Sequence, residues 1–87
     1  KVDGSVLVRG HTDNRPIRSA RFPSNWHLSQ ARADAVAEAL APQLGGRPKI
    51  KTEGRADSEA VASNDTPEGR AQNRRVEIIV FPAARSN

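Results

Sequence analysis

The feature that most constrains this fold is an alanine-rich segment, residues 24–42, between two short runs of β-forming residues. Ser24 is a favourable N-cap residue, and the five alanines within residues 31–39 raise the helix propensity. Pro42 and the glycine pair at 45–46 predict where the helix ends. The spacing therefore predicts a helix of about 16–19 residues, roughly 25–28 Å long.

Three β-forming runs accompany this helix. Residues 5–9 predict a strand, and its adjacent apolar residues Leu7 and Val8 indicate burial on both faces. Residues 50–54 alternate in polarity and predict a second strand. Residues 76–81 are the strongest β-former in the chain, so a third strand is expected there.

A second, shorter helix is expected before the last strand. Thr66 is a capping residue and Pro67 suits the first helical position, which predicts about two turns ending near Asn73. The resulting order is strand, long helix, strand, short helix, strand. A helical crossover favours a right-handed β-α-β unit, so we expect an α+β fold with the helices packed on one face of a small mixed sheet.

Length and composition limit the chain to one small domain. It has 87 residues, 36% of them hydrophobic, and three aromatic residues, so its core is expected to be thin. No cysteine is present, which excludes disulfide bonds and thiol chemistry. The chain contains no run of 18 apolar residues, so no transmembrane helix is predicted within it. We expect the domain to span residues 1–82, with residues 83–87 as a flexible tail.

The net charge of +4 raises the question of nucleic acid. The 14 basic residues are scattered over every segment, and the three aromatic residues offer few stacking platforms for single strands. An ordinary basic surface therefore explains the charge better than a nucleic-acid interface does.

Arg32 is the most informative single position. It lies four residues after Leu28 and four before Val36, on a stripe with Ala35 and Ala39 that is predicted to face the sheet. A buried guanidinium needs a partner or a cavity, which favours a fork that binds a carboxylate. The alternative is an arginine at the edge of the stripe whose head reaches water.

Asp13 is the second candidate, because it follows the first strand and strand ends are where open α/β sheets bind small ligands. Facing Arg32, it would suit a zwitterion such as an amino acid: the carboxylate binds the ammonium and the guanidinium binds the carboxylate. Two alternatives stay open from the residues alone. Asp13 is a turn residue bonded to its own backbone, or it forms a structural salt bridge with Arg32.

Other sites are weaker. His11, Asp13 and His27 have irregular spacing for a metal site. The chain also lacks a Gly-x-Ser-x-Gly elbow and a glycine-rich phosphate loop. Of the pair Arg74 and Arg75, one is expected to turn toward the end of the sheet that carries Asp13, the alternative being a solvated surface for both.

Three separated motifs resemble the OmpA C-terminal-like, peptidoglycan-binding domain. They are Gly-His-Thr-Asp at 10–13, Asn-x-x-Leu-Ser-x-x-Arg-Ala at 25–33, and Glu-Gly-Arg-Ala-x-Asn-Arg-Arg-Val-Glu at 68–77. Within this family, residues 11–17 and 22–26 look like the branch that holds the flagellar stator proteins of the MotB type and the type VI secretion proteins of the TssL type. Residues 16–28 and 53–58 look more like the TssL type.

The resemblance implies a binding module without enzymatic activity or cofactor. In the family, the aspartate and the arginine of these motifs bind diaminopimelate of the peptidoglycan stem peptide, and they correspond to Asp13 and Arg32. The other positions that match the family's pocket are Thr12, Asn25, Leu28 and Arg74.

The resemblance also implies a location and partners. We expect the periplasmic domain of an inner-membrane protein in a Gram-negative bacterium, joined to the membrane only by a segment outside this chain. The expected partners are peptidoglycan and other subunits of a secretion membrane complex, with a homodimer possible and no nucleic acid. The alternatives are a MotB-like wall anchor of the flagellar stator and a structural or oligomerisation domain with a degenerate pocket.

Two departures from the family pattern stand out. Family domains usually carry a first strand and helix before the motif at 10–13, so we expect this chain to form three strands rather than four, with one wall of the pocket missing. Ala60 stands where the family usually has proline, which is expected to make that loop less rigid.

Overall fold

The computed structural model describes residues 4–16, 21–44 and 49–82. The elements within them are β1 (Ser5–Gly10), α1 (Asn25–Leu40), the 3-10 turn η1 (Ala41–Gln43), β2 (Lys49–Gly54), α2 (Pro67–Asn73) and β3 (Val76–Phe81). The predicted order of strands and helices is confirmed. The glycine pair at 45–46 and the predicted tail at 83–87 lie outside the described residues.

Both helices begin where capping chemistry predicts. The Ser24 hydroxyl accepts the His27 N–H, and the Thr66 hydroxyl accepts the Gly69 N–H, so each cap satisfies a donor that the first turn leaves unpaired. Pro67 occupies the start of α2, where its missing N–H costs nothing. After Leu40 the chain tightens into η1, which contains Pro42.

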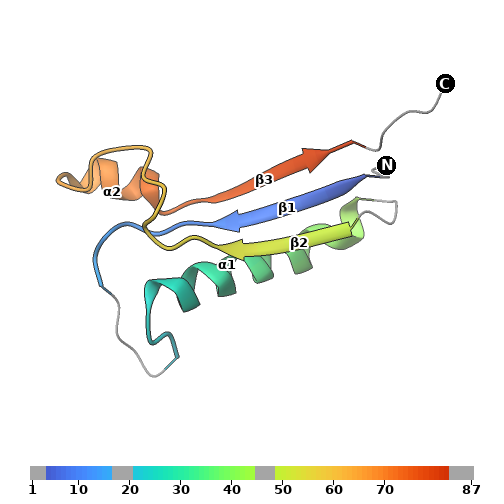
Figure 1. Cartoon of the computed structure of the whole chain (residues 1–87), viewed down its shortest axis with the longest axis horizontal. Coiled ribbons are helices and arrows are strands. Elements are labelled where there is room, and N and C mark those ends of the chain that lie inside the picture. Colours follow the sequence, from blue (N-terminus) through green and yellow to red (C-terminus); the bar gives the residue numbers. More distant parts are fainter. Residues whose placement is uncertain (1–3, 17–20, 45–48, 83–87) are drawn as a thin grey trace.

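The sheet has the strand order β2-β1-β3 (Figure 1). β1 runs parallel to β2, with Val6 opposite Ile50, and antiparallel to β3, with Val6 opposite Val80. Parallel neighbours need a crossover, and α1 supplies it. The predicted α+β fold with a small mixed sheet is confirmed. α1 lies along one face of the sheet, whereas α2 lies beyond its end (Figure 1).

A thin core forms where α1 meets β1. Val6 and Val8 point toward the helix and are buried against Ala33 and Ala37. Around them pack partly buried apolar residues: Val36, Leu40, Leu44, Ile50 and Val76. Alanine has little volume, so the helix lies close to the sheet.

The prediction of which side of α1 faces the sheet is wrong. The buried residues of α1 are Ser29, Ala33 and Ala37. Three residues predicted to face the sheet are exposed instead: Arg32, Ala35 and Ala39. Alanines at alternate positions put small apolar side chains on every side of the helix, so the alanine pattern does not identify the buried side.

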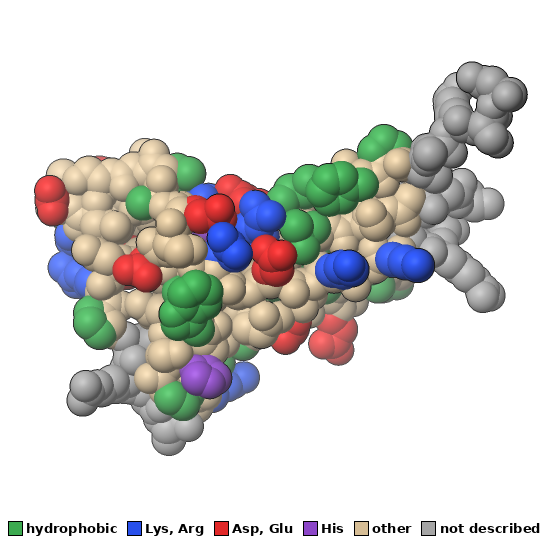
Figure 2. All heavy atoms as spheres, viewed as in Figure 1, with side chains coloured by type: hydrophobic (Ala, Val, Ile, Leu, Met, Phe, Trp, Pro, Cys, Tyr) green, Lys and Arg blue, Asp and Glu red, His purple; other side chains and the backbone are tan. Residues whose placement is uncertain are grey.

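Burial of β1 on both faces is also wrong. Its burial alternates strictly, with Val6 and Val8 buried and Leu7 only partly buried. Leu7 lies on the face opposite α1, which no described helix covers. Figure 2 shows hydrophobic side chains gathered on this open face beside lysines.

Two glycines let α1 approach the strands at the end of the sheet that carries the first candidate motif. A Cβ on Gly10 would collide with the Ser29 carbonyl oxygen, and one on Gly54 would lie 2.6 Å from the Gln30 nitrogen. The Gln30 side chain also bridges to β2, donating to Thr52 at 2.8 Å and accepting from the Gly54 N–H at 2.9 Å. The first turns of α1 are therefore held beside the loop that follows β1.

Candidate ligand-binding site

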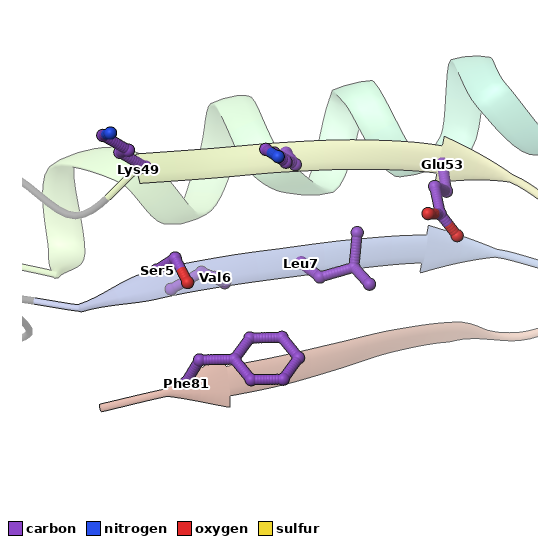
Figure 3. A pocket seen from close by; sticks show the side chains of 7 residues that line it. Ser5, Val6, Leu7, Lys49, Glu53 and Phe81 are labelled. Carbon is purple, nitrogen blue, oxygen red and sulfur yellow. The ribbon is translucent and has the colours of Figure 1, made fainter. Parts of the chain in front are cut away.

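The described residues form a hollow on the open face of the sheet and another at the end of β1. The larger, about 500 Å³, is on the open face of the sheet, with Leu7, Lys49 and Phe81 at its rim (Figure 3), and no residue of the three motifs lines it. The smaller, about 250 Å³, lies at the end of β1 against the start of α1. Its lining residues are Thr12, Asp13, Arg15, Pro16, Asn25, Leu28, Arg32 and Arg74.

The smaller hollow, the motif cleft, contains all six residues singled out from the sequence. These residues come from the loop after β1, the first half of α1 and the end of α2, so the fold brings together segments that are far apart in the chain. Arg15 and Pro16 line the motif cleft too and were not predicted as site residues. Both belong to the segment 11–17 that resembles one branch of the family, but the sequence did not assign either of them to the pocket.

Asp13 is 7% exposed and is bonded on both of its oxygens. Oδ1 accepts the Arg15 backbone N–H at 3.0 Å, which is the turn interaction considered from the sequence. Oδ2 accepts from Arg74 Nη1 at 2.7 Å in an ion pair. The salt-bridge partner is therefore Arg74, where the sequence-based alternative was Arg32.

The pKa of Asp13 reflects opposing influences. Burial raises it, but the hydrogen bond from Arg74, the Arg15 N–H and the positive charges of both arginines outweigh burial. The pKa consequently lies below the ordinary aspartate value, and the carboxylate is ionised at neutral pH. A carboxylate has roughly four lone-pair positions, so two acceptor positions remain for a ligand.

Thr12 and Asn25 hold the loop in place. The Thr12 hydroxyl donates to the Asp13 carbonyl at 2.8 Å, and the Thr12 N–H donates to the Ala56 carbonyl at 2.8 Å. Asn25, the first residue of α1, donates from Nδ2 to the Arg15 carbonyl at 2.9 Å. Their polar groups are thus largely occupied by the protein, so both act mainly by positioning Asp13 and Arg15.

Arg32 lies one helical turn after Leu28, and both residues line the motif cleft. Its side chain is exposed, so the expectation of a guanidinium buried against the sheet is wrong. Among the residues that the structure describes, Arg32 takes part in no ion pair. An arginine that lies at the edge of a cleft without an ion-pair partner in the described part of the chain is suited to bind a carboxylate of a ligand.

Asn73 is a structural residue that the sequence did not single out individually. It is fully buried at the end of α2, and its Oδ1 accepts the N–H groups of Val61 and Ala62 at 2.8 and 3.0 Å. Its Nδ2 donates to the Ala62 carbonyl and to Asn64 Oδ1 at 3.0 and 2.7 Å. The Asn73 side chain therefore holds the loop before α2 against the end of that helix, next to Arg74.

The adjacent arginines have different partners, as the sequence suggested. Arg74 contacts Asp13, whereas Arg75 donates to Glu77 Oε2 at 3.0 Å and to the Glu59 carbonyl at 2.9 Å. Strand residues alternate in direction, which explains why neighbours at the start of β3 separate. Arg74 thus belongs to the motif cleft, and Arg75 fastens the loop that contains Glu59.

His11 is buried at the end of β1 with its Nε2 2.8 Å from Glu77 Oε1. Burial raises the pKa of Glu77, but hydrogen bonds from His11 and Arg75 outweigh it and lower the pKa overall. His11 joins β1 to β3 and does not line the motif cleft. Within residues 4–16, 21–44 and 49–82, no three His, Asp or Glu side chains gather to hold a metal ion.

The fold and the motif cleft define a class: a small α+β domain with an ionised acid and several arginines at the end of a central strand. The chain belongs to the OmpA family, which it matches over residues 1–74. It is similar to the solved structure of the cell wall anchor of the type VI secretion system from Pseudomonas aeruginosa, with 57% identity and a TM-score of 0.84. That match covers 94% of this chain and 57% of the other.

Two further relatives show the breadth of the similarity. Motility protein B of Bacillus subtilis is 42% identical over 95% of this chain and 33% of its own length. Peptidoglycan-binding protein ArfA of Mycobacterium tuberculosis is 42% identical over 90% of this chain and 23% of its own length. The chain thus spans a third or less of these two proteins. No described helix is both long and apolar enough to cross a membrane.

Proposed function

We propose that this domain binds the diaminopimelate-containing stem peptide of peptidoglycan without catalysis, and so anchors a type VI secretion membrane complex to the cell wall. The observation that carries the proposal is the arrangement of charge in the motif cleft. Asp13 is ionised there, and Arg32 has no ion-pair partner among the described residues.

In this proposal the ligand is the free, zwitterionic end of diaminopimelate. Its ammonium donates to the remaining lone pairs of Asp13, and its carboxylate takes the guanidinium of Arg32. Leu28 supplies apolar surface for the methylene chain. Charge-assisted hydrogen bonds contribute about 1.5–3 kcal/mol each, so single-site affinity is modest, and firm anchoring needs several domains on one wall polymer.

The comparisons support the anchor role at two levels. ArfA is named as a peptidoglycan-binding protein, and the Pseudomonas aeruginosa structure is named as a cell wall anchor. Identity to that anchor is 57%, against 34% to the crystallised C-terminal domain of Helicobacter pylori MotB, which favours the secretion system. The second candidate is a flagellar stator anchor, favoured by the 42% identity to Bacillus subtilis motility protein B.

The proposal includes a location and assembly. The domain lies in the periplasm of a Gram-negative bacterium as part of an inner-membrane protein of the TssL type, beside other subunits of the secretion complex. The net charge of +4 suits an anionic wall polymer. A homodimer is compatible with this arrangement.

Co-sedimentation with purified peptidoglycan tests the binding role. Wild type is expected to pellet with the polymer, and Asp13→Asn and Arg32→Gln are each expected to remain mostly in the supernatant. Asp57→Asn and Lys51→Gln are matched controls, because both residues are exposed and lie outside the motif cleft. Equal sedimentation of all five proteins contradicts the assignment.

Sedimentation velocity and an NMR titration with diaminopimelate together distinguish a binding module from an oligomerisation domain. A binding module is expected to respond to diaminopimelate with a chemical-shift change in the loop 12–15. A stable dimer without any such response contradicts the binding role and supports an oligomerisation domain with a degenerate pocket.

A further inference from the structure

The motif cleft carries more positive charge than a simple zwitterion needs. Among the residues that the structure describes, three arginines, Arg15, Arg32 and Arg74, line it together with a single carboxylate, that of Asp13. Arg74 is paired with Asp13. In the part of the chain that the structure describes, the other two guanidinium groups have no ion-pair partner. A zwitterion brings one carboxylate, so one arginine is left over.

Arg15 is held in place by its backbone although its side chain is exposed. Its N–H donates to Asp13 Oδ1 at 3.0 Å, and its carbonyl accepts from Asn25 Nδ2 at 2.9 Å. Pro16 follows and restricts the Arg15 backbone to extended geometry. The base of this side chain is therefore fixed relative to both Asp13 and the start of α1.

The surrounding charge favours an anion at this position. The first turn of α1 carries no acidic residue, and its partial positive charge adds to that of the arginines. Asp13 already accepts two hydrogen bonds. No second acidic side chain of the described ranges lines the motif cleft to compensate Arg15.

We infer that Arg15 is a specificity-determining residue that receives a second carboxylate of the ligand. The inference rests on the proposed function and narrows its substrate class to a zwitterionic head with an additional free carboxylate nearby. A stem peptide offers two such groups: the α-carboxylate of its D-glutamate and the second carboxyl of diaminopimelate when no residue follows it. Amidation of the relevant group removes the charge that Arg15 binds while leaving the zwitterionic end intact.

Isothermal titration with three tripeptides tests this inference. The parent is L-Ala-γ-D-Glu-meso-diaminopimelate; one derivative carries a carboxamide at D-glutamate, and the other carries it at the peptide-side carboxyl of diaminopimelate. Wild type is expected to bind one amide about fivefold more weakly than the parent, the upper range for one partly exposed ion pair. The amide that loses affinity identifies the source of the carboxylate.

Arg15→Gln isolates the side chain, because it keeps the backbone bonds to Asp13 and Asn25. This variant is expected to bind the parent and both amides equally, at the level of the weaker amide in wild type. Lys51→Gln removes the same charge far from the motif cleft and is expected to keep the wild-type preference. Arg32→Gln is expected to weaken all three tripeptides alike, since it acts on the shared zwitterionic end.

The possible results distinguish a failure of the role of Arg15 from a failure of the proposed binding function. Equal wild-type affinity for all three tripeptides, or a preference that survives in Arg15→Gln, overturns the role of Arg15 while binding itself stands. Absence of wild-type binding to every tripeptide overturns the proposed function.

Discussion

Arg74 and Asp13 are 61 positions apart in the chain, yet the guanidinium of one donates to the carboxylate of the other at 2.7 Å. This pair joins the end of α2 to the loop after β1, across the end of the sheet. It keeps Asp13 ionised in a mostly buried position, and it engages the Arg74 guanidinium in an ion pair within the protein. Of the described residues that line the motif cleft, Arg32 and Arg15 then remain as the cations available to an incoming anion.

Arg74→Gln is expected to change the pKa of Asp13 clearly and the stability of the fold only slightly. The Arg74 side chain is 44% exposed, so its loss is expected to cost only about 0–1 kcal/mol of stability. The pKa of Asp13 is expected to rise, because burial is then opposed by fewer favourable groups. NMR titration of the Asp13 carboxyl measures this, and an unchanged pKa contradicts the influence assigned to Arg74.

Acid is expected to weaken the fold partly through Asp13. Its pKa is lower in the folded state than in the unfolded chain, so the unfolded chain binds the proton first as pH falls. The stabilisation is complete above the ordinary aspartate pKa of about 3.9 and is lost as pH falls through the lower, folded value. Thermal unfolding from pH 2 to 6 checks this.

Asp13→Asn is the matched comparison for the acid experiment. The difference in stability between wild type and this variant is expected to shrink toward acid pH, because the wild-type carboxyl becomes neutral as well. Glu77 contributes to both proteins alike, since its lowered pKa does not depend on residue 13. A difference that stays constant over this range argues against a lowered pKa at Asp13.

Asn73→Ala is expected to be strongly destabilising. The change removes the four hydrogen bonds that the buried Asn73 side chain makes to the loop before α2, and each such bond contributes about 0.5–1.5 kcal/mol. A loss of about 2–4 kcal/mol in the free energy of unfolding is expected from urea denaturation. Asn64→Ala removes a single bond to the same side chain and is the milder control, so equal losses in the two variants contradict this account.

Gly10→Ala is expected to disturb the contact between β1 and α1. The added methyl group collides with the Ser29 carbonyl oxygen, which belongs to helix backbone and cannot rotate away. Overpacking of this kind costs about 1–3 kcal/mol, and the displaced helix is expected to widen the motif cleft. Urea denaturation compares this variant with Ser5→Ala at the other end of the strand, and a neutral Gly10→Ala contradicts the close approach.

The elements were predictable because local chemistry decides them. Caps at Ser24 and Thr66, Pro67 at the start of α2 and the β-branched run at 76–81 act within a few residues of chain, and the structure confirms each. Five of the six candidate site residues lie in the loop after β1 or the first half of α1, which the chain order of a β-α-β unit brings together. Arg74 follows α2 and reaches the same cleft only through the tertiary fold.

The sequence by itself thus determined the class of fold and the set of polar residues that meet. Only the tertiary structure decided the rotation of α1, the partner of Asp13 and the placement of Arg15. The physical reason is that alanines on every side of a helix leave its buried face undetermined. Likewise, several arginines of equal charge can pair with one aspartate, so distances set by packing choose among them.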